Sequence, residues 1–514
     1  MLDQVQQRVR AHDRYQIEFK LDYELLPRPH TRYRITTYIF IPHNLSINNS
    51  TYTKAEFYRD LQNYVRLKTP SFSLQEILTA STSPLVHIDQ ILREPGWHEM
   101  PANTERLVNS FKFLRAILKS TLRNHLRTMK RRAKRDTDHQ VRAERIKGAV
   151  NELLDKTLSI IQRYRAYAAQ LKQTDGNPRI LRSYRRTDES ISLMMEERLV
   201  DAFQVVESHV QTDIQAELKA KITKTLEAEL SYRRNARYSS VLEAAGDNEA
   251  FLYRISLLKK FTSSVLYLAL VVKPEGTAIE QVLYAFAAGL SMAFATIIAF
   301  YFQNRFGNLT LPFFVALVVG YMFKDRIKEL GRLFFAQHLQ TYLYDHRSLI
   351  HTLDGLHQLG FLREKVHFMP ETKLPPAVAD LRDRGVLSDA YDGQAENIIC
   401  YTKEVVLETD VFKQIYPDGP PIHGINDIMR FDVRPYLRKM DDPVERRLYL
   451  QDGQLHLAEC AKVYYINFVT VYTLDEAQSS VRLERTLLTL TRDGIKRVER
   501  VHPQQTADAS AAQT

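Results

Sequence analysis

Apolar residues are concentrated in two uncharged stretches near the middle of the chain. The first, 282–302, is followed by the polar turn 303–308 and by the second, 309–323. At ~1.5 Å per residue the first spans about 30 Å as a helix, the thickness of a bilayer's hydrocarbon core, and the second about 22 Å. Helices joined by so short a turn are antiparallel. The pattern predicts a transmembrane hairpin, and the alternative is a buried hairpin in a large soluble core.

Small residues recur at every fourth position in both stretches and predict how the helices pack. They are Ala285, Gly289 and Ala293 in the first stretch and Ala316 and Gly320 in the second. Such rows let helix backbones approach closely in lipid. We expect the two rows to pack on each other within one chain. Pairing with a second copy is the alternative.

The first hundred residues have the pattern of an α+β region. Apolar and polar residues alternate over 15–25, which predicts a half-buried strand, and 32–41 is a second expected strand. Antiparallel pairing of the two would set opposite charges face to face, with Asp22 near Arg34. An amphipathic helix is expected over 54–67.

Helical spacing of apolar residues continues over 103–238 and predicts a bundle or coiled coil of about four helices. A break at 136–138 separates the first two helices, which gives a helical hairpin with a basic tip. The second pair is expected over 189–209 and 213–232.

Beyond the second apolar stretch the pattern predicts a helix over 324–353, then a connector, then antiparallel strands over 397–501. Asp452-Gly453 is typical of a type I′ hairpin turn, and Asp493-Gly494 repeats the signal. The apolar segment 263–272 is too short to cross a membrane. We expect it to form a strand or an interfacial segment.

Together these patterns predict an α+β membrane protein with an N-terminal α/β region, a long-helix bundle, a two-helix transmembrane hairpin and a C-terminal antiparallel β domain. The expected divisions are 1–102 (N-terminal α+β domain), 103–245 (helical bundle or coiled coil with a basic tip), 246–278 (juxtamembrane segment with a short strand), 279–323 (transmembrane hairpin), 324–395 (cytosolic helical connector), 396–502 (C-terminal β domain) and 503–514 (disordered tail).

The net charge of +10 is concentrated in one segment, 123–147, which carries ten Lys or Arg and three acids. Clustered cations bind phosphate or carboxylate groups. The segment 121–147 has no aromatic residue for base stacking, so sequence-specific nucleic acid is not expected as a partner. We predict that an acidic lipid or an acidic protein face binds the tip, and the alternative is a solvated helix end. The predicted binding residues are Lys130, Arg131, Arg132, Lys134 and Arg135.

Basic residues also flank the hairpin and set its predicted orientation. Because the turn between the stretches holds only Arg305, the positive-inside rule places both termini in the cytoplasm, and a bacterial inner membrane is the expected location. Contacts with lipid headgroups are predicted for Lys259, Lys260, Lys324, Arg326 and Lys328.

Motifs of catalysis are absent from the sequence, which has no phosphate-binding glycine loop, no serine elbow and no HExxH. The best metal-ligand candidates are His346, His351 and Asp354, on the expected helix after the hairpin, but their spacing does not converge and no metal or cofactor is predicted. The two cysteines, Cys400 and Cys460, fit a reducing compartment.

These features predict an interaction, scaffold or sensing platform held at a membrane by two spans, and they favour a non-enzyme over an enzyme. One alternative is an oligomeric membrane-active or transport component assembled through Gly289 and Gly320. Another is a membrane-bound enzyme whose site is built from scattered residues near His351.

Overall fold

The computed structural model divides the chain into two compact units, each assembled from segments far apart in the sequence. It describes residues 6–173, 177–211, 213–242, 248–307, 310–339, 343–383, 396–474 and 481–501. The first unit contains Met1–Val65, Leu268–Val411 and Ile425–Thr514, and the second contains Arg66–Tyr267 and Phe412–Gly424.

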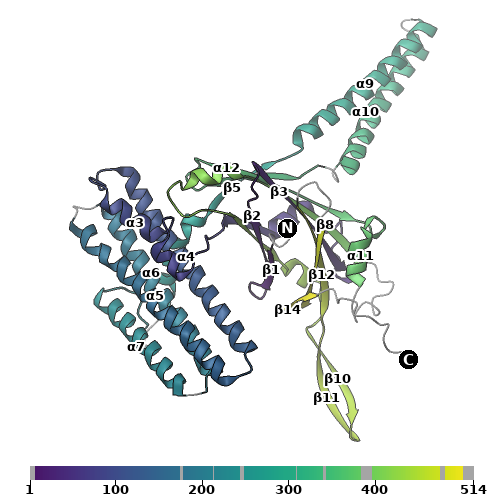
Figure 1. The fold of residues 1–514 in the computed structure, drawn as a ribbon. Coiled ribbons are helices and arrows are strands. Elements are labelled where there is room, and N and C mark those ends of the chain that lie inside the picture. Colours follow the sequence, from purple (N-terminus) through teal and green to yellow (C-terminus); the bar gives the residue numbers. More distant parts are fainter. Residues whose placement is uncertain are drawn as a thin grey trace, which may run out of the picture. The chain divides into compact units, whose positions relative to one another are not determined.

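The first unit is organised around an eight-stranded antiparallel sheet (Figure 1). In spatial order its strands are β14 (Gly494–Val501), β13 (Val481–Thr491), β12 (Tyr464–Leu474), β3 (His30–Pro42), β8 (Glu396–Glu408), β7 (Gln358–Met369), β6 (His346–Thr352) and β5 (Leu268–Pro274). The N-terminal strand β3 lies in the middle of this sheet, between β12 and β8. The N-terminal and C-terminal regions therefore form one structure, where the sequence led us to expect two domains.

A second sheet packs on the first through aromatic side chains. Its order is β1 (Gln6–Ala11), β2 (Gln16–Glu24), β9 (Gly424–Asp432) and β4 (Leu61–Leu67). The rings of Phe19 and Phe468 lie 5.2 Å apart, and those of Tyr23 and Tyr33 5.1 Å apart. The apolar face of β2 thus builds the core between the sheets.

The predicted pairing of the first two strands, β2 with β3, is wrong because the two lie in different sheets. Arg34 is 3.6 Å from Glu404 on β8, and Asp22 is paired with Lys20 at 2.9 Å. Strand β3 is apolar on both faces near its end, so burial between β8 and β12 outweighs the local turn. The helix expected over 54–67 is also shorter than predicted, because the chain joins the second sheet as β4 after Asp60.

Short helices complete the first unit and its junctions. They are α1 (Lys54–Asp60), α11 (Pro376–Asp383), α12 (Thr409–Ile415) and α13 (Arg434–Leu437). Strands β10 (Val444–Gln451) and β11 (Gln454–Ala461) form a separate two-stranded ribbon. Asp452 and Gly453 both have positive φ, 53° and 77°, in agreement with the predicted turn. At the second site the turn residues are Arg492 and Asp493, and Gly494 already pairs with Thr491.

The second unit is helical, as predicted for this region. Its helices are α2 (Leu74–Thr79), α3 (Pro84–Arg93), α4 (Pro101–Arg135), α5 (His139–Gln173), α6 (Pro178–His209), α7 (Asp213–Asn235) and α8 (Glu249–Ser263). The expected apolar row of α4 is fully buried, from Leu107 through Phe111 to Leu122. Helices α4 and α5 meet at 136–138, where the sequence predicted the break.

Helices α9 (Thr277–Phe306) and α10 (Leu311–Leu339) form a hairpin inserted between the paired strands β5 and β6 (Figure 1). The short apolar segment before it is strand β5, one of the two forms expected. The cytosolic helical connector expected over 324–395 is wrong in its middle part, where β6 and β7 lie. In that part β6 pairs with β5 and β7 pairs with β8. This pairing outweighs the helical spacing of apolar residues, which is weak there.

Candidate functional site

Helix α9 carries a long uncovered apolar surface. The apolar range Gln281–Phe306 has 26 residues, and its most apolar stretch has a mean hydropathy of 2.0, with 11% of that stretch buried. Phe286, Ile297 and Phe300 are all exposed. In the described part of the chain this is the one helix long and apolar enough to cross a membrane. A core helix of a soluble protein would be covered, and α9 is not covered by the described residues.

The packing of α9 on α10 fixes their register. A Cβ on Gly320 would lie 3.5 Å from Cγ2 of Ile298, and one on Gly331 would lie 3.0 Å from Cβ of Ala287. The guanidinium of Arg332 lies 5.1 Å from the ring centre of Tyr284. The helices are therefore antiparallel, with the apolar part of α10 beside the last half of α9. The charged part of α10, 324–332, lies beside the first half.

The two rows of small residues do not face each other, contrary to our expectation. Ala316 and Gly320 of α10 do pack on α9, but Ala285, Gly289 and Ala293 are exposed, and a Cβ on Gly289 would meet nothing within 4 Å. The face of α9 against α10 contains Ala287 and Ser291 instead. At 100° per residue a shift of two positions turns a side chain to nearly the opposite face, which explains the difference.

Two acids fasten the base of the hairpin to the sheet. The Glu275 N–H donates to the Asp345 carbonyl at 3.1 Å, and Arg363 Nε donates to the Glu275 carboxylate at 2.8 Å. The Asp345 carboxylate accepts from Lys54 Nζ at 2.6 Å and from the Tyr58 hydroxyl at 2.9 Å. Burial and the nearby Asp345 raise the pKa of Tyr58 well above its usual range. Sequence reasoning missed this cluster because its members come from four distant segments.

The predicted headgroup residues are divided between the two units. Lys259 and Lys260 are exposed near the end of α8, and the other three lie within α10. Lys324 Nζ is 3.8 Å from the ring centre of Tyr321, one turn earlier. Lys324, Arg326 and Lys328 are therefore part of a continuous helix and do not mark its end.

The five cations of the basic tip lie together in the last turns of α4, and all five are exposed. In the part of the chain that the structure describes, none of them has an ion-pair partner. Nearby on α5, Arg145 binds the Asp136 carboxylate at 2.7 Å and Arg142 donates to the Asp136 carbonyl at 2.9 Å. A groove of about 840 Å³ between α4 and α5 is lined by His125, Arg132, Arg135 and these two arginines. The tip is thus a cationic surface whose charge the described residues do not neutralise.

The metal-ligand candidates lie on strands and a turn, where the sequence predicted a helix. His346 and His351 are on β6, five positions apart, and Asp354 is in the following turn. The His346 ring packs on Tyr58, with ring centres 4.5 Å apart, and Asp354 accepts a hydrogen bond from Thr352 at 2.5 Å. Among the described residues no three His, Cys, Asp or Glu side chains are placed to hold a metal ion.

Two enclosed polar clusters were not predicted. Between the sheets, fully buried Lys403 lies 2.6 Å from Asp427 and 3.8 Å from Glu364. In the helical unit, Arg165 donates to Glu229 at 2.8 and 2.9 Å and to Asp188 at 3.1 Å. Because water and substrates have no access to Asp188 or Lys403, these clusters position elements and are not candidates for catalysis.

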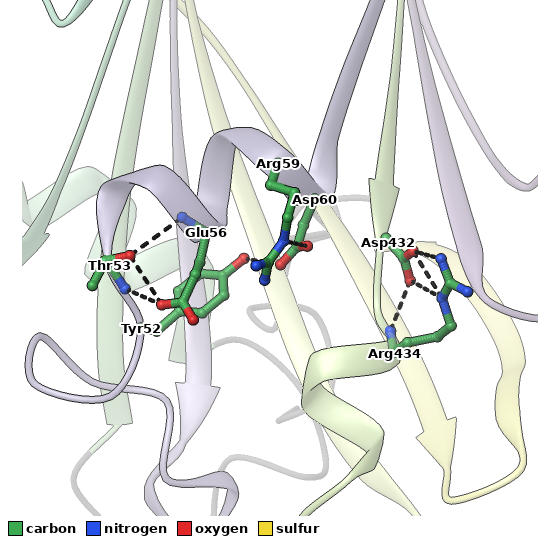
Figure 2. A network of polar contacts seen from close by, with 7 residues as sticks. All are labelled: Tyr52, Thr53, Glu56, Arg59, Asp60, Asp432 and Arg434. Carbon is green, nitrogen blue, oxygen red and sulfur yellow. Dashed lines mark hydrogen bonds and ion pairs between the residues drawn. The ribbon is translucent and has the colours of Figure 1, made fainter.

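Two further sets of polar contacts lie at α1 and at the end of β9 (Figure 2). Thr53 caps α1 through Glu56, and the buried Tyr52 hydroxyl donates to Asp60 at 2.8 Å. Burial raises the pKa of Asp60. In Figure 2, Arg434 bends back onto Asp432, which holds the end of β9. The contacts at α1 cap a helix, and those of Arg434 close the end of a strand. Neither set contains a nucleophile beside a base.

Comparison with known proteins gives no assignment. No family model, no curated protein and no solved structure matches this chain. The hairpin and the basic tip are therefore the features of the molecule that point to a function.

Proposed function

We propose that this chain is an integral membrane protein that acts as an interaction or sensing platform. The hairpin of α9 and α10 anchors it with two spans, and the sheet unit and the helical unit lie on the cytoplasmic side. The observation that carries the proposal is the uncovered apolar surface of α9. The fastened base of the hairpin, through Glu275 and Asp345, supports a rigid connection between anchor and sheet.

The basic tip is the proposed recruiting surface for an acidic lipid or an acidic protein face. Its charge is local, exposed and unpaired among the described residues, which is what attraction of an anionic partner requires. Changing Lys130, Arg131 and Lys134 to Glu should weaken binding to the partner. The matched control changes three exposed cations at the far end of the same bundle, Lys172, Arg179 and Arg182, to Glu. If the tip variant and the control variant weaken binding equally, the basic tip is not the recruiting surface.

The anchoring itself is tested by flotation of full-length protein from broken cells on a density gradient. Ile297 and Phe300 are exposed on α9, and changing both to Arg adds at most about 5–7 kcal/mol to the cost of insertion, the sum for two arginines at the centre of a span. We expect the wild type to float with membranes and this variant to remain at the bottom. The control places the same two arginines at exposed Val141 and Val200 of the helical unit and should float. A wild-type protein that does not float contradicts the proposal.

A second candidate is an oligomeric membrane component, for which the exposure of Ala285, Gly289 and Ala293 is the favouring observation. A row of small residues directed away from the partner helix is available to another copy. Gly320 no longer supports this candidate, since it packs on Ile298 of its own chain. Loss of cross-linking between copies in Gly289→Leu would support it.

A further inference from the structure

The ribbon of β10 and β11 has one face made of leucines that nothing covers. Leu448 pairs with Leu457 and Leu450 with Leu455, so their four side chains lie on the same side. Their exposed fractions are 67%, 59%, 70% and 71% in that order. The opposite face carries Tyr449 and His456. Figure 1 shows the ribbon as a separate pair of strands.

A two-stranded ribbon alone is marginally stable in water, and an apolar face normally packs on a further layer. In the described part of the chain no such layer covers the leucines. A lipid surface is a poor fit, because the turn residues Gln451, Asp452 and Gln454 are polar. The ribbon 444–461 also carries two arginines against three acids, so anionic headgroups would not attract it.

The charges beside the leucines match a second copy of the same face. Arg446 and Glu459 are directly opposite each other on the two strands, on the leucine side, and their side chains lie 3.1 Å apart. A twofold axis along the ribbon would place β10 of one copy over β11 of the other. Arg446 of each copy then faces Glu459 of its partner, and each leucine pair faces another leucine pair. Both ribbons extend in the same direction in this arrangement.

We propose that the leucine face of β10–β11 is a homodimer interface in which two ribbons stack in parallel. The proposal does not depend on the basic tip, and it applies equally if the protein is not membrane-bound. It is tested with full-length protein in mild detergent by energy transfer between copies labelled at Cys460. That thiol is exposed on the opposite face of the ribbon, whereas Cys400 is buried.

We expect transfer when donor-labelled and acceptor-labelled wild-type copies are mixed. The double variant Leu450→Lys/Leu457→Lys should weaken association at least tenfold. The control Tyr449→Lys/His456→Lys, with the same charges on the other face, should retain it. Wild-type copies that show no transfer overturn the proposal, as do leucine variants that retain it. Binding of the leucine face to neutral lipid vesicles without transfer would assign the face to lipid instead.

A charge exchange tests the arrangement even if a single variant folds poorly. Arg446→Glu copies place acids against acids, and Glu459→Arg copies place cations against cations, so each should fail to self-associate. When the two variants are mixed, every acid faces a cation and transfer should return. Exchange on the other face, through Arg447→Glu and Glu445→Arg, should leave self-association unchanged. Failure of the mixed pair to associate contradicts parallel stacking.

Discussion

Lys403 shows at the level of single residues how the sheets are held in place. It is fully buried, and its ammonium group is placed between the carboxylates of Asp427 and Glu364. Burial raises the pKa of Asp427, although the nearby Lys403 opposes the shift. A buried ion group of this kind costs solvation free energy and contributes specificity, because shifting either sheet would leave a charge without a partner.

His367 is a half-buried titratable group without such compensation. It lies on β7 opposite Cys400, and neither ring nitrogen has a hydrogen-bond partner among the described residues. Burial and the nearby Lys365 and Lys54 lower its pKa to about 4. The unfolded chain has a His pKa of about 6.5. Between these values the unfolded state binds more protons, so this residue lowers stability as the pH falls.

We therefore expect His367 to cost about 2 kcal/mol of unfolding free energy when the pH falls from 7 to 5. The measurement is urea unfolding of the full chain in detergent at both pH values, followed by circular dichroism. His367→Phe should lose less stability than the wild type over this interval by that amount. Replacing the exposed His139 with Phe is the control and should leave the wild-type pH dependence unchanged. If the unfolding free energy of His367→Phe depends on pH as that of the wild type does, the His367 ring takes up a proton as readily in the folded state as in the unfolded state.

At the level of elements, sequence patterns predicted features that depend on neighbouring residues and missed contacts between segments far apart in the chain. The break at 136–138 between α4 and α5 was predictable, because helical period and capping depend on neighbouring residues. The position of β3 was not, because its partners β8 and β12 begin more than 350 residues later. The same limit applies to the candidate site. Basic residues of the tip are adjacent in sequence, whereas Glu275 and Asp345 become neighbours only when β5 pairs with β6.

The contact between α9 and α10 is tested by a disulfide across it. Ala287 and Gly331 face each other closely, so Ala287→Cys/Gly331→Cys should cross-link within one chain when Cys460 is replaced by Ser. Adding Gly320→Leu should reduce cross-linking severalfold, because its side chain would collide with Ile298. Gly289→Leu is the matched control, since a side chain there meets nothing within 4 Å. Both results are read as a mobility shift on non-reducing gels. Equal cross-linking in the two leucine variants would contradict the packing.

At the level of the whole molecule, the register of the hairpin restricts how it can lie in a membrane. The apolar part of α10, 311–323, covers only about 20 Å. Two spans therefore require a thinned bilayer or cationic side chains of α10 that extend toward the headgroups. A shallow hairpin would avoid this strain but would leave Arg305 near the middle of the bilayer. An isolated charge there costs more than modest thinning, which favours two spans.

Labelling with a membrane-impermeant maleimide distinguishes these arrangements. In the proposed topology a cysteine at Arg305, in a Cys460→Ser background, should react from outside in intact cells. Cys460 of the otherwise unchanged protein should react only after the cells are opened, because the proposed topology places the sheet unit in the cytoplasm. A shallow hairpin predicts that Arg305→Cys stays unreactive from either side, and an inverted orientation predicts the reverse pattern. The positive-inside rule requires the first result, since Lys324, Arg326 and Lys328 cannot all remain cytoplasmic in an inverted hairpin.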